Sequence, residues 1–225
     1  MNYRVLIVDD HPLYRLALKG AVAQACADGE LIEADSVAGL FDALERHPRM
    51  DLVLLDLNLP DAHGFNALAH LRGSLPELPV IVVSAADDPR TIGQALAFGA
   101  QGFVSKSADA ATIGRSVQAV LRGEVVAPTG LGSDGDHSAA AAALEVAQRL
   151  AQLTPQQFRV LGMLCAGRLN KQIAEDLRIT EATVKAHITV ILRKLGAANR
   201  TQAVALAGRL AYGRGEIKPL PEGIE

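Results

Sequence analysis

The stretch LVLLDLNLPDAHG, residues Leu52 to Gly64, joins a fully apolar run to a carboxylate and two turn residues. Leu52 to Leu55 show no alternation of apolar and polar side chains, which is typical of a strand buried on both faces of a parallel sheet. That run leads directly into Asp56, and Pro60 and Gly64 then turn the chain toward the next helix. The stretch therefore predicts a carboxylate held rigidly at the edge of a buried sheet.

The first half of the chain repeats this alternation of a short apolar run and an amphipathic stretch. Repeated strand–helix units predict an α/β fold, a doubly wound five-stranded parallel sheet with helices on both faces. The predicted strands are Arg4–Val8, Leu31–Ala34, Leu52–Leu55, Val80–Val83 and Gly102–Val104, and the predicted helices are Leu13–Ala25, Val37–Arg46, Phe65–Arg72, Pro89–Phe98 and Asp109–Arg122.

The pattern changes after Glu124. Residues 128–137 (PTGLGSDGDH) have the composition of a polar linker. The next stretch, Ser138 to Gln152, has high helix propensity and places Leu144, Ala147, Leu150 and Ala151 on one face; a disordered Ala-rich tract is the alternative.

From Leu153 onward the pattern is wholly helical. Thr154 and Pro155 begin a first helix that ends at Gly167, and a short second helix ends near Arg178. A longer third helix runs from its cap at Thr180 to Gly196, and a last helix covers Thr201–Tyr212. Two helices joined by a tight turn inside a small bundle predict an all-α, four-helix, helix-turn-helix domain. The predicted division of the chain is residues 1–124, a linker at 125–152, a helical domain at 153–214 and a loose tail at 215–225.

Charge divides along the same line. Residues 1–124 carry ten Lys or Arg against sixteen Asp or Glu, a net charge of −6, whereas residues 152–214 carry ten against three, a net charge of +7. A basic helical half is expected to meet a polyanion such as DNA.

Cys26 and Cys165 are far apart in apolar surroundings, which indicates small core residues in a reducing compartment. Neither a secretory leader nor a membrane span is recognisable, so we expect a soluble, cytoplasmic protein.

Polar side chains follow the predicted strands at their carboxyl ends. Asp9 and Asp10 follow the first strand, Asp56 the third, Ser84 the fourth and Lys106 the fifth. In an open parallel sheet these ends meet along one edge, where ligands bind. Crowded carboxylates repel one another unless a cation joins them, and oxygen ligands suit Mg²⁺. One carboxylate can then attack phosphorus while the metal and a lysine neutralise the phosphoryl oxygens.

Four motifs, VDD, DLNLPDAHG, VSA and FVSK, stand in this order at the strand ends, and together they resemble the receiver domain of two-component response regulators, with its flavodoxin-like fold. The resemblance implies that Asp56 is the phosphoacceptor. It implies that Asp10, Asp56 and the backbone carbonyl of Asn58 bind Mg²⁺ directly and that Asp9 binds it through water. It also implies roles for Lys106 as counter-charge, Ser84 as switch hydroxyl and Phe103 as switch aromatic.

Two positions depart from the family pattern. Ser107 replaces the proline that commonly follows the lysine, and a cis Lys106–Ser107 bond would cost roughly 3–4 kcal/mol, so the sequence leaves cis and trans open. Phe103 lacks the hydroxyl of the tyrosine that is often found there. Burial of Phe103 on activation remains feasible, but a new hydrogen bond from it does not.

The third helix of the basic half separates two kinds of face. Val184, Ile188, Ile191, Leu192 and Leu195 recur at helical spacing as a core face, whereas Lys185, Thr189 and Arg193 lie together on another face beside Ala182 and Ala186. Basic and small residues on one face suit a helix that enters a major groove, although a solvated charged face is the plain alternative.

The segment from LTPQQ through NRTQAV resembles the LuxR-type helix-turn-helix of NarL/FixJ response regulators. The resemblance implies that Lys185, Ala186 and Thr189 face bases and that further residues lie near phosphates: Asn170, Lys171, Thr183, His187, Arg193 and Lys194. Asn170 has a helix cap as its alternative role, and His187 a packed structural one. The last helix offers a dimer surface at Thr201, Val204, Leu206 and Leu210, with packing inside its own bundle as the alternative.

The sequence as a whole indicates a response regulator. A sensor histidine kinase would phosphorylate Asp56, and the protein would then open or form a homodimer that binds promoter double-stranded DNA and regulates transcription. The resemblance implies no enzyme activity beyond the receiver's own phosphoryl transfer and slow dephosphorylation. A Mg²⁺-dependent phosphatase would need an aspartate where Asn58 stands. Two further alternatives are a DNA-binding protein controlled by a partner and a receiver that acts mainly through protein contacts. The sequence also leaves open whether the inactive state is closed or extended.

Overall fold

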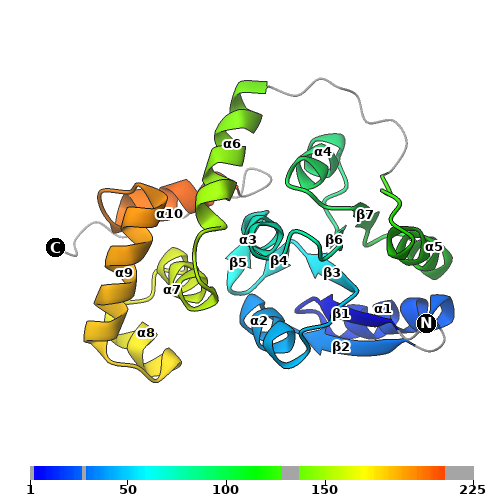
Figure 1. The fold of residues 1–225 in the computed structure, drawn as a ribbon, viewed down its shortest axis with the longest axis horizontal. Coiled ribbons are helices and arrows are strands. Elements are labelled where there is room, and N and C mark those ends of the chain that lie inside the picture. Colours follow the sequence, from blue (N-terminus) through cyan, green and yellow to red (C-terminus); the bar gives the residue numbers. More distant parts are fainter. Residues whose placement is uncertain (1–2, 27–28, 128–136, 211–225) are drawn as a thin grey trace.

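The computed structural model describes residues 3–26, 29–127 and 137–210. Its first half is built on a five-stranded parallel sheet with the order β2-β1-β3-β6-β7 (Figure 1). Without the short strands β4 and β5, this is the doubly wound order 2-1-3-4-5 that the strand–helix repeat predicts. The strands are β1 (Arg4–Val8), β2 (Glu30–Ala34), β3 (Leu52–Asp56), β6 (Val80–Ser84) and β7 (Gly102–Ser105).

Helices cover both faces of this sheet. Alternate residues of β1 point into two separate cores, with Val5 and Ile7 on one side and Leu6 and Val8 on the other. Because both faces are buried, apolar side chains occupy the central strands β3 and β6 up to their last residues, as the sequence predicts. One face is covered by α1 (Pro12–Ala25) and α5 (Ala110–Leu121), and the other by α2 (Val37–Arg46), α3 (Asn66–Ser74) and α4 (Pro89–Ala97).

A small hairpin follows β3 and was not predicted. It pairs β4 (Asn58–Leu59) antiparallel with β5 (Ala62–His63), and Pro60 and Asp61 form its tip. Gly64 ends the hairpin at a φ of 61°, in the left-handed region that glycine adopts without strain. Strands of two residues are too short for periodicity to reveal them, so the sequence indicated only a turn here.

The second half of the described chain is helical, as predicted: α6 (His137–Leu150), α7 (Pro155–Cys165), α8 (Asn170–Leu177), α9 (Glu181–Leu195) and α10 (Arg200–Gly208). The predicted caps are confirmed, because Thr154 accepts from the Gln157 amide and Thr180 from the Thr183 amide. Gly196 ends α9 with a φ of 66°. Arg178, with a φ of 54°, forms the turn between α8 and α9.

Several local predictions need correction. The last helix ends at Gly208 and not at Tyr212, because the chain turns at Arg209 and Leu210 to meet the first domain. Leu144 is exposed, whereas Val146 is buried with Ala147 and Leu150. These buried residues of α6 pack against both halves of the protein, whereas the sequence pattern predicted a single apolar face on this helix. The predicted linker residues 128–136 and the tail fall outside the described residues.

The two halves pack against each other. Helix α6 lies against α3 of the first half and against α9 and α10 of the second, and α7 lies against α2 (Figure 1). One apolar cluster continues from the α2–α3 face of the sheet through Val146 and Phe158 into the helical half. Between the closed and extended arrangements that the sequence left open, the structure is therefore closed.

Candidate functional site

The strand ends bring the predicted acidic residues and Lys106 into contact. Asp9 directly follows β1, Asp56 is the last residue of β3, and Lys106 directly follows β7. The Lys106 Nζ atom lies 2.6 Å from Asp9 Oδ2 and 2.7 Å from Asp56 Oδ2. Asp9 is fully buried and Asp56 is 2% exposed, so one ammonium group pairs with two carboxylates that are almost out of water and offsets only one of their two charges.

Burial dominates the electrostatics of this site. Desolvation raises the pKa of Asp56 above its usual value, although hydrogen bonds from Lys106 and from the Asn58 amide favour the charged form. Burial also opposes the charged form of Lys106, but its hydrogen bonds to Asp56 and Asp9 prevail and raise the pKa of the ammonium group. A carboxylate in this setting is held in place and is poorly solvated, which suits a nucleophile.

Tyr14 and His11 belong to the site and were not predicted. Lys106 Nζ lies 4.9 Å above the centre of the Tyr14 ring, a cation–π distance. Burial and then the charges of Asp9 and Asp56 raise the pKa of Tyr14 to about 12, so its hydroxyl stays protonated. His11 Nδ1 lies 2.6 Å from Asp10 Oδ1. His11 directly follows the quoted VDD and Tyr14 stands three residues later, but nothing in the sequence showed that the start of α1 faces the site.

The donor set fits a divalent cation. Ligand atoms of Asp9, Asp10, His11 and Asp56 all lie within 4.8 Å of one another. Three of the four are carboxylates, and Mg²⁺ prefers oxygen ligands and keeps several waters, for which the exposed side of the cluster leaves room. Asn58, which the resemblance implied as a backbone ligand, lines the same surface pocket as Asp56.

The site opens to solvent through a pocket of about 580 Å³. Asp56 and Lys106 are on its wall together with both polar and apolar neighbours: His11, Leu13, Tyr14, Ala17, Asn58 and Ala85. The pocket is large enough to admit a phosphoryl group and the end of the group that carries it.

The two predicted switch residues lie next to the site on neighbouring strands. Ser84 is the last residue of β6, is fully buried, and its Oγ accepts a 3.2 Å hydrogen bond from the Ala86 amide. Phe103 of β7 is 2% exposed and pairs in register with Val82. The aromatic ring is thus already inside the protein in this closed form.

The Lys106–Ser107 peptide bond, which the sequence left open as cis or trans, is resolved by the structure. Among the described residues no peptide bond is cis, so this bond is trans. A hydroxyl network stands where the family commonly has a proline: Ser105 Oγ lies 2.7 Å from Ser107 Oγ and donates a 2.7 Å bond to Asp87 Oδ2.

Helix α9 presents the predicted DNA-reading face to solvent. Val184, Ile191 and Leu195 are buried, and Ile188 and Leu192 pack against the core, as the periodicity predicted. Most of the predicted contact residues on this helix are exposed, whereas His187 is half-buried; the exposed ones are Thr183, Lys185, Ala186, Thr189 and Arg193.

Three predicted phosphate contacts stand in different surroundings. Lys171 is exposed. The Lys194 ammonium group already donates 2.8 Å hydrogen bonds to the Gln152 carbonyl and to Gln157 Oε1. Asn170 is not a helix cap, because Leu169 occupies the cap position of α8, and the Asn170 Oδ1 atom is buried without a partner in the described structure.

The residues suggested as a dimer surface do not form one exposed face. Thr201 is exposed and Leu206 is half-buried, whereas Val204 is 8% and Leu210 1% exposed. Val204 and Leu210 belong to the common core. Packing, which the sequence kept as the alternative, therefore describes these two residues.

Comparisons with known proteins agree with this geometry. Residues 5–118 match the family described as response regulator receiver domain, and residues 151–207 match bacterial regulatory proteins of the luxR family. The chain is 37% identical over 219 residues to the glycerol metabolism activator of Pseudomonas putida, covering 93% of this chain and 97% of that protein. It is 30% identical over 202 residues to the nitrate/nitrite response regulator protein NarL of Escherichia coli K12, covering 88% and 92%.

Solved structures support the fold. A complex described as the two-component response regulator RcsB with DNA gives a TM-score of 0.54 at 20% identity, covering 94% of this chain and 100% of that one. Within the part of the chain that the structure describes, no helix is both long and apolar enough to cross a membrane.

Proposed function

The chain belongs to the response regulators that join a receiver domain to a LuxR-type DNA-binding domain, and we propose that phosphorylation of Asp56 by a sensor histidine kinase controls its activity. It is a DNA-binding transcriptional regulator. The observation that carries the proposal is the Lys106 ammonium group held between Asp9 and Asp56 at an open pocket. A generic surface cluster of acids would have no reason to place the buried Asp56 carboxylate, at the end of β3, against a lysine that follows β7, two strands away in the sheet.

Phosphoryl transfer follows from this arrangement. A carboxylate oxygen of Asp56 attacks phosphorus as the bond from phosphorus to the donor histidine nitrogen breaks, and the released imidazole keeps its electron pair. Asp10, Asp56 and the Asn58 carbonyl would hold Mg²⁺, with Asp9 acting through water, and the ion would offset charge on the phosphoryl oxygens. Lys106 turns from the Asp56 carboxylate toward the same oxygens, and Ser84 supplies a hydroxyl beside them.

The surface next to the pocket suits a protein as phosphodonor. Leu13 and Leu16 in the first turns of α1 are 84% and 64% exposed, although both are large and apolar. Leu13 also lies on the pocket rim. An apolar platform beside a phosphoacceptor gives a donor protein something to bind while its histidine reaches Asp56.

Residue ranges and location follow from the same reasoning. We assign residues 1–124 to the receiver, 125–152 to the linker, 153–214 to the DNA-binding domain and 215–225 to a tail. The DNA target and the unpaired thiols of Cys26 and Cys165 favour a cytoplasmic location.

DNA recognition is assigned to the exposed face of α9. Lys185, Ala186 and Thr189 would meet base edges, and Thr183, Arg193, Lys171 and Asn170 would lie near phosphates, with His187 beside them. Lys194, which the resemblance also implied, is left out because its ammonium group is hydrogen-bonded to Gln152 and Gln157. Ala186 and Thr189 favour contact with thymine methyl groups, so direct readout is modest and a homodimer on an inverted repeat would supply the remaining specificity. Thr201 and Leu206, which are accessible on α10, are the dimer residues that this closed form leaves available.

The test is selection of genomic DNA fragments by the purified protein, with and without Mg²⁺ and acetyl phosphate. An inverted repeat recovered only with the donor supports control by phosphorylation. The same repeat recovered equally in both conditions would leave DNA binding in place and remove phosphorylation as the control. In parallel, Asp56→Asn should take up no label from acetyl phosphate, while the wild-type protein does; label on the variant would refute Asp56 as the acceptor.

A further inference from the structure

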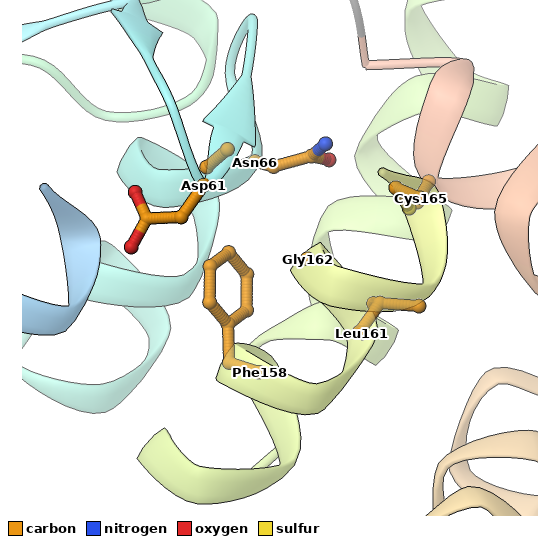
Figure 2. Close-up of a pocket in the computed structure, with 8 residues that line it drawn as sticks. Asp61, Asn66, Phe158, Leu161, Gly162 and Cys165 are labelled. Atoms are coloured by element: carbon orange, nitrogen blue, oxygen red, sulfur yellow. The ribbon is translucent and has the colours of Figure 1, made fainter. Parts of the chain in front are cut away.

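The hairpin β4–β5 connects the phosphoacceptor pocket directly to the DNA-binding domain. Its first residue, Asn58, donates a 3.2 Å hydrogen bond from its amide to Asp56 Oδ1. Its tip, at Asp61, lies against α7 of the DNA-binding domain (Figure 2). A few residues therefore separate the site of phosphorylation from the domain that it would control.

The contact at the tip is a close approach of backbone to backbone. A Cβ atom placed on Gly162 of α7 would overlap the carbonyl oxygen of Asp61. An overlapping neighbour must move, and here the neighbour is backbone, which yields less readily than the end of a side chain. Gly162 therefore permits the hairpin to rest on α7, and any larger residue would push the two apart.

The Asp61 side chain ties the same tip to α2. In Figure 2 its carboxylate points away from α7, and it accepts 2.8 Å hydrogen bonds from the Val37 and Ala38 amides at the start of that helix. The Ala38 carbonyl in turn accepts a 3.1 Å bond from Arg159 of α7, whose guanidinium also pairs with Asp42 at 2.9 Å. A shift of the hairpin would therefore displace α7 directly at Gly162, and indirectly at Arg159 through α2.

The closed form does not cover the DNA-reading face. Lys185, Ala186 and Thr189 are exposed while the receiver is docked. Release of the receiver is therefore not needed to bring these side chains to the surface. Helix α7, however, packs on both α2 of the receiver and α9, so a change in α7 can alter how α9 is presented.

We propose that phosphorylation of Asp56 is transmitted to the DNA-binding domain through the β4–β5 hairpin, by the contact of Asp61 with Gly162. The inference rests on the proposed function and assigns the route by which that function is regulated. Phosphorylation adds charge and bulk beside Asn58, at the root of the hairpin, and α7 receives the displacement of the tip. Ser84 and Phe103, which would be the receiver's other response to the same event, stand on β6 and β7 and are not part of the hairpin.

The test compares Gly162→Ala with Gly93→Ala in the full chain. Both glycines lie inside helices, but a Cβ on Gly93 of α4 meets nothing within 4 Å. Amide hydrogen exchange is followed with and without Mg²⁺ and beryllofluoride as the phosphoryl mimic. In the wild-type protein and in Gly93→Ala, we expect the mimic to change exchange at the hairpin and in α7 by severalfold. In Gly162→Ala, we expect the change at the hairpin to persist and the change in α7 to be lost.

Asp61→Asn provides a second variant that leaves the α7 glycine intact. It keeps the backbone carbonyl and one acceptor oxygen, and it should give a partial loss of the α7 response. A full α7 response in Gly162→Ala, or a wild-type α7 that ignores the mimic while the hairpin responds, would overturn the proposed route. If the mimic changes exchange nowhere around Asp56, both the proposed function and the proposed route are wrong. This result differs from a response at the hairpin without one in α7, which would overturn the route alone.

Discussion

The His70 imidazole of α3 lies flat against the Phe158 ring of α7, with centroids 4.5 Å apart and planes 12° apart. The Phe41 ring meets His70 edge-on at 5.0 Å. The Nδ1 atom of His70 lies 3.0 Å from the Leu150 carbonyl, so it carries the proton of the neutral ring. This buried histidine therefore joins the receiver to both α6 and α7.

The first prediction concerns pH. Burial, opposed by the bond to the Leu150 carbonyl, lowers the pKa of His70 to about 4. A histidine with a lowered pKa supports the docked state fully above its free pKa of about 6.5, and the support is lost as pH falls from there toward 4. The full loss is roughly 3 kcal/mol, since each pKa unit is worth about 1.4 kcal/mol. Small-angle scattering between pH 7 and pH 4 should show the two domains separating.

The control for this prediction is His70→Phe, which keeps a ring against Phe158 but does not titrate. Its docking should be weaker at pH 7, because the Leu150 carbonyl loses the hydrogen bond from His70 and keeps only the one from the Leu153 amide. Its scattering profile should then change much less than that of the wild-type protein across the same range. An equal change in both proteins would show that another group drives the transition.

The second prediction concerns the charge balance at the phosphoacceptor. Lys106→Met leaves Asp9 and Asp56 buried without their shared cation, and removal of one partner of a buried pair costs roughly 3 kcal/mol or more. Because Mg²⁺ can take the place of the lost ammonium, the ion should raise the melting temperature of the variant more than that of the wild-type protein. Uptake of phosphoryl label should nevertheless fall, since the variant lacks the counter-charge for the phosphoryl oxygens.

The matched control is Lys19→Met. Lys19 pairs with Glu33 at 2.6 Å, but both side chains are more than a third exposed, so the loss should stay within about 1 kcal/mol. Its Mg²⁺ response should equal that of the wild-type protein. If Mg²⁺ fails to stabilise Lys106→Met beyond the wild-type protein, the carboxylates do not bind the ion as assigned.

The third prediction separates two neighbouring basic residues at the end of α9. Arg193 is exposed, whereas Lys194 is half-buried and its ammonium group donates hydrogen bonds to Gln152 and Gln157. Arg193→Gln should lower the slope of the logarithm of DNA affinity against the logarithm of salt concentration by about 1, the value expected for one lost phosphate contact. It should leave the free energy of unfolding unchanged. Lys194→Gln should lower stability by roughly 1 kcal/mol and leave the salt dependence unchanged. Titrations of DNA at several salt concentrations, together with urea unfolding, distinguish these outcomes.

The fourth prediction concerns the end of α9. Gly196 has a φ of 66°, and the Arg149 guanidinium of α6 donates to the Leu195 carbonyl beside it. Gly196→Ala should cost about 1–2 kcal/mol in unfolding free energy, because a Cβ is strained in this conformation. Gly20→Ala in α1, where a Cβ meets nothing within 4 Å, should instead be neutral or stabilising by up to about 1 kcal/mol. Urea unfolding of both variants measures the difference, and an unaffected Gly196→Ala would contradict the strain.

Much of the site could be read from local sequence because the relevant physics is local. An apolar strand without alternation, followed by a carboxylate, places Asp56 at a sheet edge whatever the rest of the chain does. Asp9, Ser84 and Lys106 follow by the same rule. Thr154, Thr180 and Gly196 set helix ends through their own side chains and backbone, so their roles too are visible in the sequence.

Other features depend on contacts between distant segments, and sequence patterns do not contain them. Tyr14 lies at the proposed phosphoacceptor site because the first turn of α1 faces Lys106. Lys194 is held by Gln152 and Gln157, which are distant in the chain and accept its hydrogen bonds. Burial of Val146 in place of Leu144 depends on α6 facing two domains at once.

The sequence by itself therefore determined the two folds, the place of Asp56 at the sheet edge and the exposed polar face of α9, since each rests on periodicity or on residues close in the chain. The tertiary structure alone decided how the domains meet: His70 stacked on Phe158, Asp42 paired with Arg159, and Asp61 resting on Gly162. These contacts join residues far apart in the chain, and their free energy depends on shape, burial and backbone approach, which no local pattern records.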